Sequence, residues 1–139
     1  MIAPTKRAIS GIKKNNLKKG ILEKFANKDV LVHNYLIWNS FNQKPKVSKS
    51  KQELAVLPKS IRISASRSLF FFNERLDKLY SVKYAEFLKI IHSLKPWEEL
   101  DAYLFDESMQ WIIAHTHDRD ILVIGNPYGI VYQKKGIGM

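Results

Sequence analysis

The sequence predicts an α+β fold: an antiparallel meander of four or five strands with helices packed on one face and a basic, helical N-terminal segment. Three observations favour it. Residues 100–133 contain four short apolar runs separated by turn-forming residues. Residues 82–95 have the apolar spacing of a surface helix. Residues 61–72 alternate between apolar and polar side chains, as a half-buried strand does.

Length and composition indicate one domain, spanning residues 1–139. Apolar residues make up 45% of the chain, enough for a core, and there is no cysteine for a disulfide or a thiolate metal site. The N-terminus has no apolar stretch of signal-peptide length, and no run approaches the 18 apolar residues of a membrane span. We therefore expect a cytoplasmic protein that does not bind membranes.

Charge is segregated along the chain. Residues 1–51 hold twelve basic and two acidic residues, whereas residues 52–139 hold eleven of each, so the net charge of +10 lies in the first third. Residues 97–120 reverse the balance, with seven acidic residues and one basic residue. The sequence thus predicts a basic N-terminal part and an acidic segment near the sheet.

The basic part reads as helical, followed by a loop. Apolar residues recur every three to five positions over 5–28, which predicts one or two short helices. Residues 29–41 fit either a strand or a helix with Asp29 as N-cap, and we favour the helix. Prolines and Ser/Lys pairs over 42–60 predict an exposed loop.

The α+β core is expected to span residues 61–135. In the strand at 61–72, we expect one apolar face that contains Ile61, Ile63, Ala65, Leu69 and Phe71. This strand either lies at the edge of the sheet or pairs with the meander. Asn73 is a possible N-cap for a short helical stretch that contains Leu76, Leu79 and Tyr80.

Helix 82–95 is expected to end at Pro96, which cannot continue a helix. The meander then follows. Its strands are expected at 100–105, 109–116, 121–124 and 130–133, and the last residues are expected to fray.

The most informative stretch is YLFDESMQWIIAHTHD, residues 103–118. On a strand, His115 would share a face with Trp111, which we expect in the core, and His117 would continue that face. Two imidazoles on one side of a strand can bind a metal. No third histidine follows in register, however, so we favour a structural role and expect no metal. Asp106 and Glu107 are adjacent, which favours a turn over an acid/base pair.

Motifs for catalysis are absent from the sequence. There is no phosphate-binding glycine loop, no dinucleotide-binding fingerprint and no G-x-S-x-G elbow, and the lack of cysteine removes a thiol nucleophile. We therefore expect no catalytic residue and no cofactor.

The spacing Tyr103-x-x-Asp106-x-x-x-x-Trp111-x-x-x-x-Thr116-His117-Asp118 resembles a hairpin in small bacterial α+β protein families, some of them of the toxin-immunity type. The resemblance covers about sixteen of the 139 residues. It implies a small binding protein and carries no catalytic residue.

Two functions follow as expectations. The first is a non-catalytic bacterial immunity protein, or antitoxin, that binds and neutralises a protein toxin. Its partner-binding residues would be the acidic ones: Glu98, Glu99, Asp101, Asp106, Glu107, Asp118 and Asp120. The alternative is nucleic-acid binding by a basic patch: Lys13, Lys14, Lys18, Lys19, Lys44, Lys46, Lys49 and Lys51. An enzyme that uses His115 and His117 is the weakest of the hypotheses, and the sequence does not predict an oligomeric state.

Overall fold

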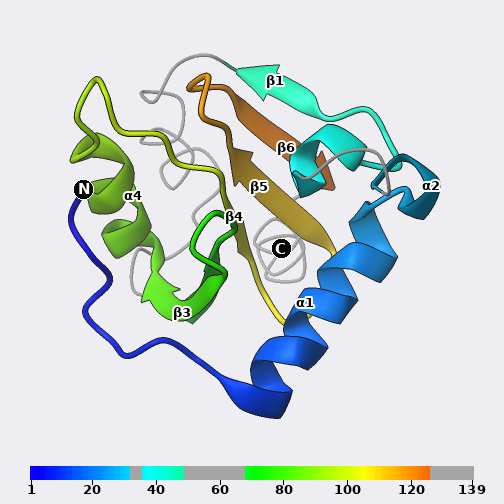
Figure 1. The fold of residues 1–139 in the computed structure, drawn as a ribbon, viewed down its shortest axis with the longest axis horizontal. Coiled ribbons are helices and arrows are strands. Elements are labelled where there is room, and N and C mark those ends of the chain that lie inside the picture. The colour runs from blue at the N-terminus through cyan, green and yellow to red at the C-terminus, as the bar shows by residue number, and fades with distance from the viewer. Residues whose placement is uncertain (32–35, 49–67, 126–139) are drawn as a thin grey trace, which may run out of the picture.

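The computed structural model describes residues 1–31, 36–48 and 68–125 (Figure 1). It confirms the α+β class. The described helical elements and strands, in chain order, are α1 (Gly11–Phe25), α2 (Lys28–Leu31), the 3₁₀ helix η1 (Ile37–Ser40), β1 (Lys46–Ser48), β2 (Ser68–Asn73), β3 (Lys78–Lys83), α4 (Tyr84–His92), β4 (Ala102–Phe105), β5 (Trp111–His115) and β6 (Ile121–Gly125).

These strands form one antiparallel sheet in the order β1-β6-β5-β4-β2-β3. It has six strands rather than the four or five expected. The meander β4-β5-β6 and α4 lie where the sequence predicted them. The strand expected at 61–72 is described from Ser68 onward, and it is an interior strand between β4 and β3 rather than an edge.

The sheet is covered on both faces, which differs from the prediction of helices on one face. Residues of α4 pack with Leu69 and Phe71 of β2 in one apolar cluster, whereas residues of α1 pack with Phe70 and Phe72 in the other. Figure 1 shows α1 and α4 on opposite sides of the sheet. The reason lies in the Phe70–Phe72 run, because consecutive side chains of a strand point to opposite faces and each apolar face needs a cover.

The structure confirms the prediction that Trp111 lies in the core. Its side chain is buried in the α4 cluster together with Ile113. Alternation along a strand that began at 109 would put Met109 on the Trp111 face, but Met109 packs in the α1 cluster instead. The cause is the backbone of Met109, whose φ of +55° breaks the strand alternation before β5 begins.

The prediction of a helical stretch after Asn73 is wrong. Residues 74–77 form the turn of a hairpin, and β3 pairs with β2 along its whole length. Asp77 closes the turn with φ at +52°, a conformation that aspartate tolerates better than most residues. Leu79 is fully buried in the α1 cluster, and Tyr80 packs against the α4 cluster. Spacing that resembled a helix was therefore produced by a two-sided strand.

The N-terminal part contains one helix of 15 residues where the sequence predicted one or two short ones. One helix, α1, runs through Asn15, Asn16 and Gly20. For residues 29–41, the described elements are helical, α2 at the start and η1 near the end, and Phe41 then forms an isolated bridge with Ala26. The cap of α2 is Asn27 rather than Asp29, because Asn27 Oδ1 accepts the backbone N–H groups of Asp29 and Val30 at 3.1 and 3.3 Å.

The loop expected at 42–60 contains a strand. β1 pairs with β6 and forms one edge of the sheet, so residues 46–48 are not loop. The rest of that segment from residue 49, the start of the strand expected at 61–72, the fourth meander strand at 130–133 and the C-terminal tail lie outside the described residues. The described helices include none with the length and apolarity needed to cross a membrane.

Candidate protein-binding surface

Asp101 is the centre of a polar cluster at the end of the sheet where β4 begins and β5 ends. Its side chain is fully buried. Oδ1 accepts hydrogen bonds from Trp38 Nε1 at 2.9 Å and from the backbone N–H of His117 at 2.9 Å. Oδ2 accepts one from Arg75 Nε at 2.5 Å. One carboxylate thereby joins η1, the β2–β3 turn and the β5–β6 turn.

A second carboxylate, Glu74, holds η1 from the same turn. Glu74 accepts the backbone N–H of Ile37 at 3.1 Å and the Tyr103 hydroxyl at 2.5 Å. The Tyr103 hydroxyl in turn accepts the backbone N–H of Trp38 at 2.8 Å. These bonds satisfy the N–H groups at the start of η1, which has no side-chain cap of its own.

The two carboxylates have opposite pKa shifts. Burial alone would raise the pKa of Asp101, but the hydrogen bonds from Arg75, Trp38 and His117 outweigh it and lower the pKa. Burial raises the pKa of Glu74, because its hydrogen bonds with Tyr103 and Ile37 offset burial only in part. Burial, followed by the nearby charge of Glu74, also raises the pKa of Tyr103 far above its ordinary value.

The two histidines have separate structural roles. His115 is fully buried, and its Nδ1 lies 2.8 Å from the Leu100 carbonyl oxygen. His117 lies beyond the end of β5, where its Nδ1 donates to Asp101 Oδ1 at 3.0 Å and its ring lies 5.7 Å from that of Trp38. Among the described residues, no group of three His, Asp or Glu side chains is placed to hold a metal ion.

Asp106 organises the β4–β5 turn. One carboxylate oxygen accepts the Ser108 backbone N–H at 3.0 Å and the Ser108 hydroxyl, and the other accepts Trp111 Nε1 at 3.2 Å. This is the turn chemistry expected for Asp106.

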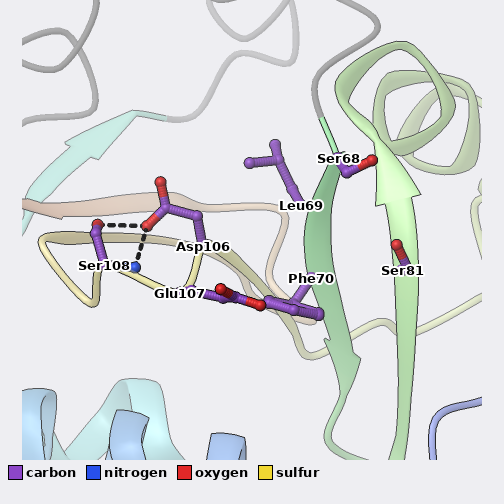
Figure 2. Close-up of a pocket in the computed structure, with 7 residues that line it drawn as sticks. All are labelled: Ser68, Leu69, Phe70, Ser81, Asp106, Glu107 and Ser108. Carbon is purple, nitrogen blue, oxygen red and sulfur yellow. Dashed lines mark hydrogen bonds between the residues drawn. The ribbon is translucent and has the colours of Figure 1, made fainter.

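A hollow of about 280 Å³ lies beside that turn, at the opposite end of the sheet from Asp101. Figure 2 shows the side chains around it, from the start of β2, from β3 and from the β4–β5 turn. Its lining residues are Ser68, Leu69, Phe70, Ser81, Asp106, Glu107 and Ser108. Since Asp106 is already bound to Ser108 and Trp111, Glu107 supplies the exposed carboxylate of the hollow.

Arg119, from the β5–β6 turn, holds the loop that follows α4. The Nη2 atom of Arg119 donates to the carbonyl oxygens of Lys95 at 2.7 Å, Pro96 at 3.4 Å and Glu98 at 2.8 Å. Glu98 closes the loop by accepting the backbone N–H of Lys95 at 2.9 Å. The indole of Trp97 projects from this loop with 77% of its surface exposed.

The fold divides the seven predicted acidic residues into two groups. Asp101 and Asp106 are buried and bound inside the protein, so they are corrected from contact residues to structural ones. The remaining residues stay at least partly exposed: Glu98, Glu99, Glu107, Asp118 and Asp120. Glu107 lies at the hollow, and the other four lie at the end of the sheet that holds Asp101. We call these four, Glu98, Glu99, Asp118 and Asp120, the acidic end.

The predicted basic patch is partly used within the fold. Lys14 and Lys18 of α1 form ion pairs with Asp77 at 3.2 and 2.6 Å. The ammonium groups of Lys13 and Lys18 each lie 5.5 Å from a phenylalanine ring, Phe70 and Phe72 respectively. Lys19, Lys44 and Lys46 are exposed, and Lys49 and Lys51 lie outside the described residues.

Several residues of this surface were missed in the sequence. Arg75, Glu74 and Trp38 are far from the 97–120 segment along the chain, and only the fold brings them to Asp101. Trp97 carried a local signal, because a tryptophan directly after Pro96 and before two glutamates stands where a loop is expected.

Comparison with known families assigns the chain to a family whose function is unknown. Residues 7–134 match the family of unknown function DUF6756, so the chain belongs to that family. No curated protein and no solved structure matches the chain.

Proposed function

We propose that the protein is a non-catalytic binding protein that recognises a protein partner through its acidic end, and that it acts as a bacterial immunity protein by neutralising a toxin. The observation that carries the proposal is the division of the acidic residues. The buried carboxylates hold η1 and the turns in place through hydrogen bonds. The exposed carboxylates lie on these same turns and the adjoining loop.

This arrangement suits binding because the scaffold is fixed before a partner arrives. The β5–β6 turn bears Asp118 and Asp120, and it is tied to Asp101 through His117 and to the α4 loop through Arg119. Glu99 is tied to the same cluster by Arg75, at 3.0 Å. A surface that is already ordered loses little conformational freedom on association.

Charge segregation supports a basic partner. The acidic end brings four carboxylates together on a protein whose net charge is +10, and two of them are paired, Glu98 with the Met1 amino group and Glu99 with Arg75. Segregated charge orients an approaching protein and raises its association rate.

The test uses the protein encoded by the gene immediately upstream. We expect its expression to stop bacterial growth and expect co-expression of the present chain to restore growth. The double variant Glu99→Lys/Asp118→Lys should lower the association rate about tenfold or more, because the reversed charges repel a basic partner. The control is Glu23→Lys, which changes an exposed acid on α1. No binding by the wild type, or equal rates for all three proteins, would contradict the proposal.

A further inference from the structure

We infer that Trp97 is the anchor of this interface: its indole enters an apolar pocket of the partner that is rimmed by lysine and arginine side chains. The inference rests on the proposed function and deepens it, since it names the residue and the partner chemistry. It starts from the exposure of the indole, which is 77%. Tryptophan is one of the residue types enriched among those that dominate binding energy.

The exposure of Trp97 is imposed by a rigid loop rather than by a frayed end. Arg119 holds three carbonyl oxygens of residues 95–98 through one nitrogen, so both sides of Trp97 are fixed. The Glu98 N–H donates to the Lys95 carbonyl at 3.0 Å and closes a tight turn around the tryptophan. The backbone that presents the indole therefore needs no reordering on binding.

Two further exposed apolar residues lie next to the loop that carries Trp97. Met1 and Ile2, 36% and 54% exposed, are held beside the same loop. The amino group of Met1 lies 2.6 Å from both Glu98 oxygens, and the Ile2 N–H donates to Ser93 Oγ at 2.8 Å. Figure 1 shows the N-terminus beside α4. Exposed apolar side chains that gather within a charged rim mark interaction sites, whereas scattered ones do not.

The rim identifies the chemistry of the occupant. Glu99 follows Trp97 by two residues and pairs with Arg75 while staying exposed, and Asp118, also exposed, precedes the arginine that holds the loop. A basic protein surface complements these charges around a desolvated aromatic anchor. An anionic lipid surface would be repelled by the same two carboxylates, which favours a protein over a membrane.

The experiment compares Trp97→Ala with Ile12→Ala by titration calorimetry against the purified upstream-encoded protein at 150 mM salt. Ile12 is the matched control, because it is an apolar side chain of α1 with 80% exposure. We expect Trp97→Ala to weaken binding by at least about 30-fold, the size that defines a dominant interface residue. Ile12→Ala should bind as the wild type does, and both variants should keep the wild-type melting temperature because neither side chain is buried.

A third variant, Arg119→Lys, tests the role of the arginine in positioning the loop. Lysine keeps the charge but lacks the planar group that reaches several carbonyls at once. We expect weaker binding of the upstream-encoded protein with an unchanged melting temperature, because the loop loses its support; binding equal to the wild type would show that Arg119 does not position Trp97.

The outcomes separate the two proposals. If the wild type binds and Trp97→Ala binds equally well, the anchor is wrong and the binding function stands. If the wild type does not bind the upstream-encoded protein, both fail. If the tryptophan emission of the wild type, but not that of Trp97→Ala, shifts to the blue with anionic phosphatidylserine vesicles, and neither shifts with that protein, the surface is a membrane contact and the inference is overturned.

Discussion

Asp101 shows how a single buried carboxylate can join distant parts of a chain. It accepts hydrogen bonds from η1, from the β2–β3 turn and from the β5–β6 turn, and its own backbone carbonyl accepts the Glu74 N–H at 2.9 Å. Each donor satisfies part of a charge that would be costly if it were buried alone. The acidic end therefore depends on a residue whose own side chain is fully buried.

Asp101→Asn should destabilise the protein by about 1.5–3 kcal/mol, since the amide removes the negative charge and turns one acceptor into a donor that faces Arg75 or His117. Denaturant unfolding at pH 7 measures this loss. Asp118→Asn is the control, and we expect a change within about 0.5 kcal/mol because Asp118 is exposed. Equal stabilities of the two variants would show that the Asp101 cluster does not support the fold.

The pH dependence of stability should reveal the opposite shifts of Asp101 and Glu74. The pKa of Asp101 lies below its ordinary value of 3.8, so its contribution is present above that pH and is lost as the pH falls through the folded-state pKa. The pKa of Glu74 lies above 4.5, so its ionisation opposes folding, and the stability from its protonated form is lost as the pH rises through the folded-state pKa.

The deficit of Asp101→Asn should therefore shrink as the pH falls below 3.8. Glu74→Gln, which keeps an acceptor for Ile37 and Tyr103, should gain on the wild type as the pH rises from 4 to 7. Unfolding curves of the three proteins between pH 3 and pH 7 test both trends. Parallel curves would contradict the assignment of these shifts.

At the scale of elements, apolar periodicity correctly predicted the helix and strands that are formed by local sequence. It failed for the strands that form only by pairing with residues far away in the chain. Helix α4 and strands β4 to β6 were found from their apolar spacing and turn residues. Strand β3 was read as a helix because Leu76, Leu79 and Tyr80 fit a helical stripe. Only its pairing with β2 and burial on both faces make it a strand. β1 was missed for a similar reason, since three residues after Pro45 pair with β6, about 75 residues later.

Two glycines should respond in opposite ways to alanine. In Gly20→Ala, the new Cβ would lie 2.7 Å from Met109 Cε, the free end of a flexible side chain that can move. The helix gains about 0.5–1 kcal/mol from losing a glycine, so we expect a higher melting temperature. In Gly125→Ala, the Cβ would lie 2.2 Å from the Gln110 carbonyl oxygen, and φ is +76°.

We expect Gly125→Ala to cost more than about 1 kcal/mol, because both the backbone conformation and the close contact oppose a side chain. Thermal unfolding of the two variants, followed by circular dichroism, checks the pair. A lower melting temperature for Gly20→Ala would mean that Met109 cannot move aside, and that α1 packs on the sheet more tightly than its contacts indicate.

At the scale of the whole molecule, the sequence predicted the segregation of charge but not its use. The counts located a basic front and an acidic segment, yet they could not show that Lys14 and Lys18 pair with Asp77. They also could not show that two of the seven acids are buried. Both facts depend on contacts between residues that are far apart in the chain. Pairing within the fold uses charge on both sides: Lys14 and Lys18 pair with Asp77, and Glu98 and Glu99 pair with the Met1 amino group and Arg75.

The central claim is that the acidic end binds a protein and that the basic part does not serve as a nucleic-acid site. The most direct measurement is a salt titration of binding to random duplex DNA and RNA, run beside binding to the upstream-encoded protein. Nucleic-acid binding through lysines should fall with a log–log slope of about −0.9 per neutralised phosphate on duplex DNA. We predict that it vanishes near 150 mM salt, where charges are screened over about 8 Å, while the protein complex persists. Sub-micromolar nucleic-acid binding at 150 mM salt without binding of the protein would contradict the account.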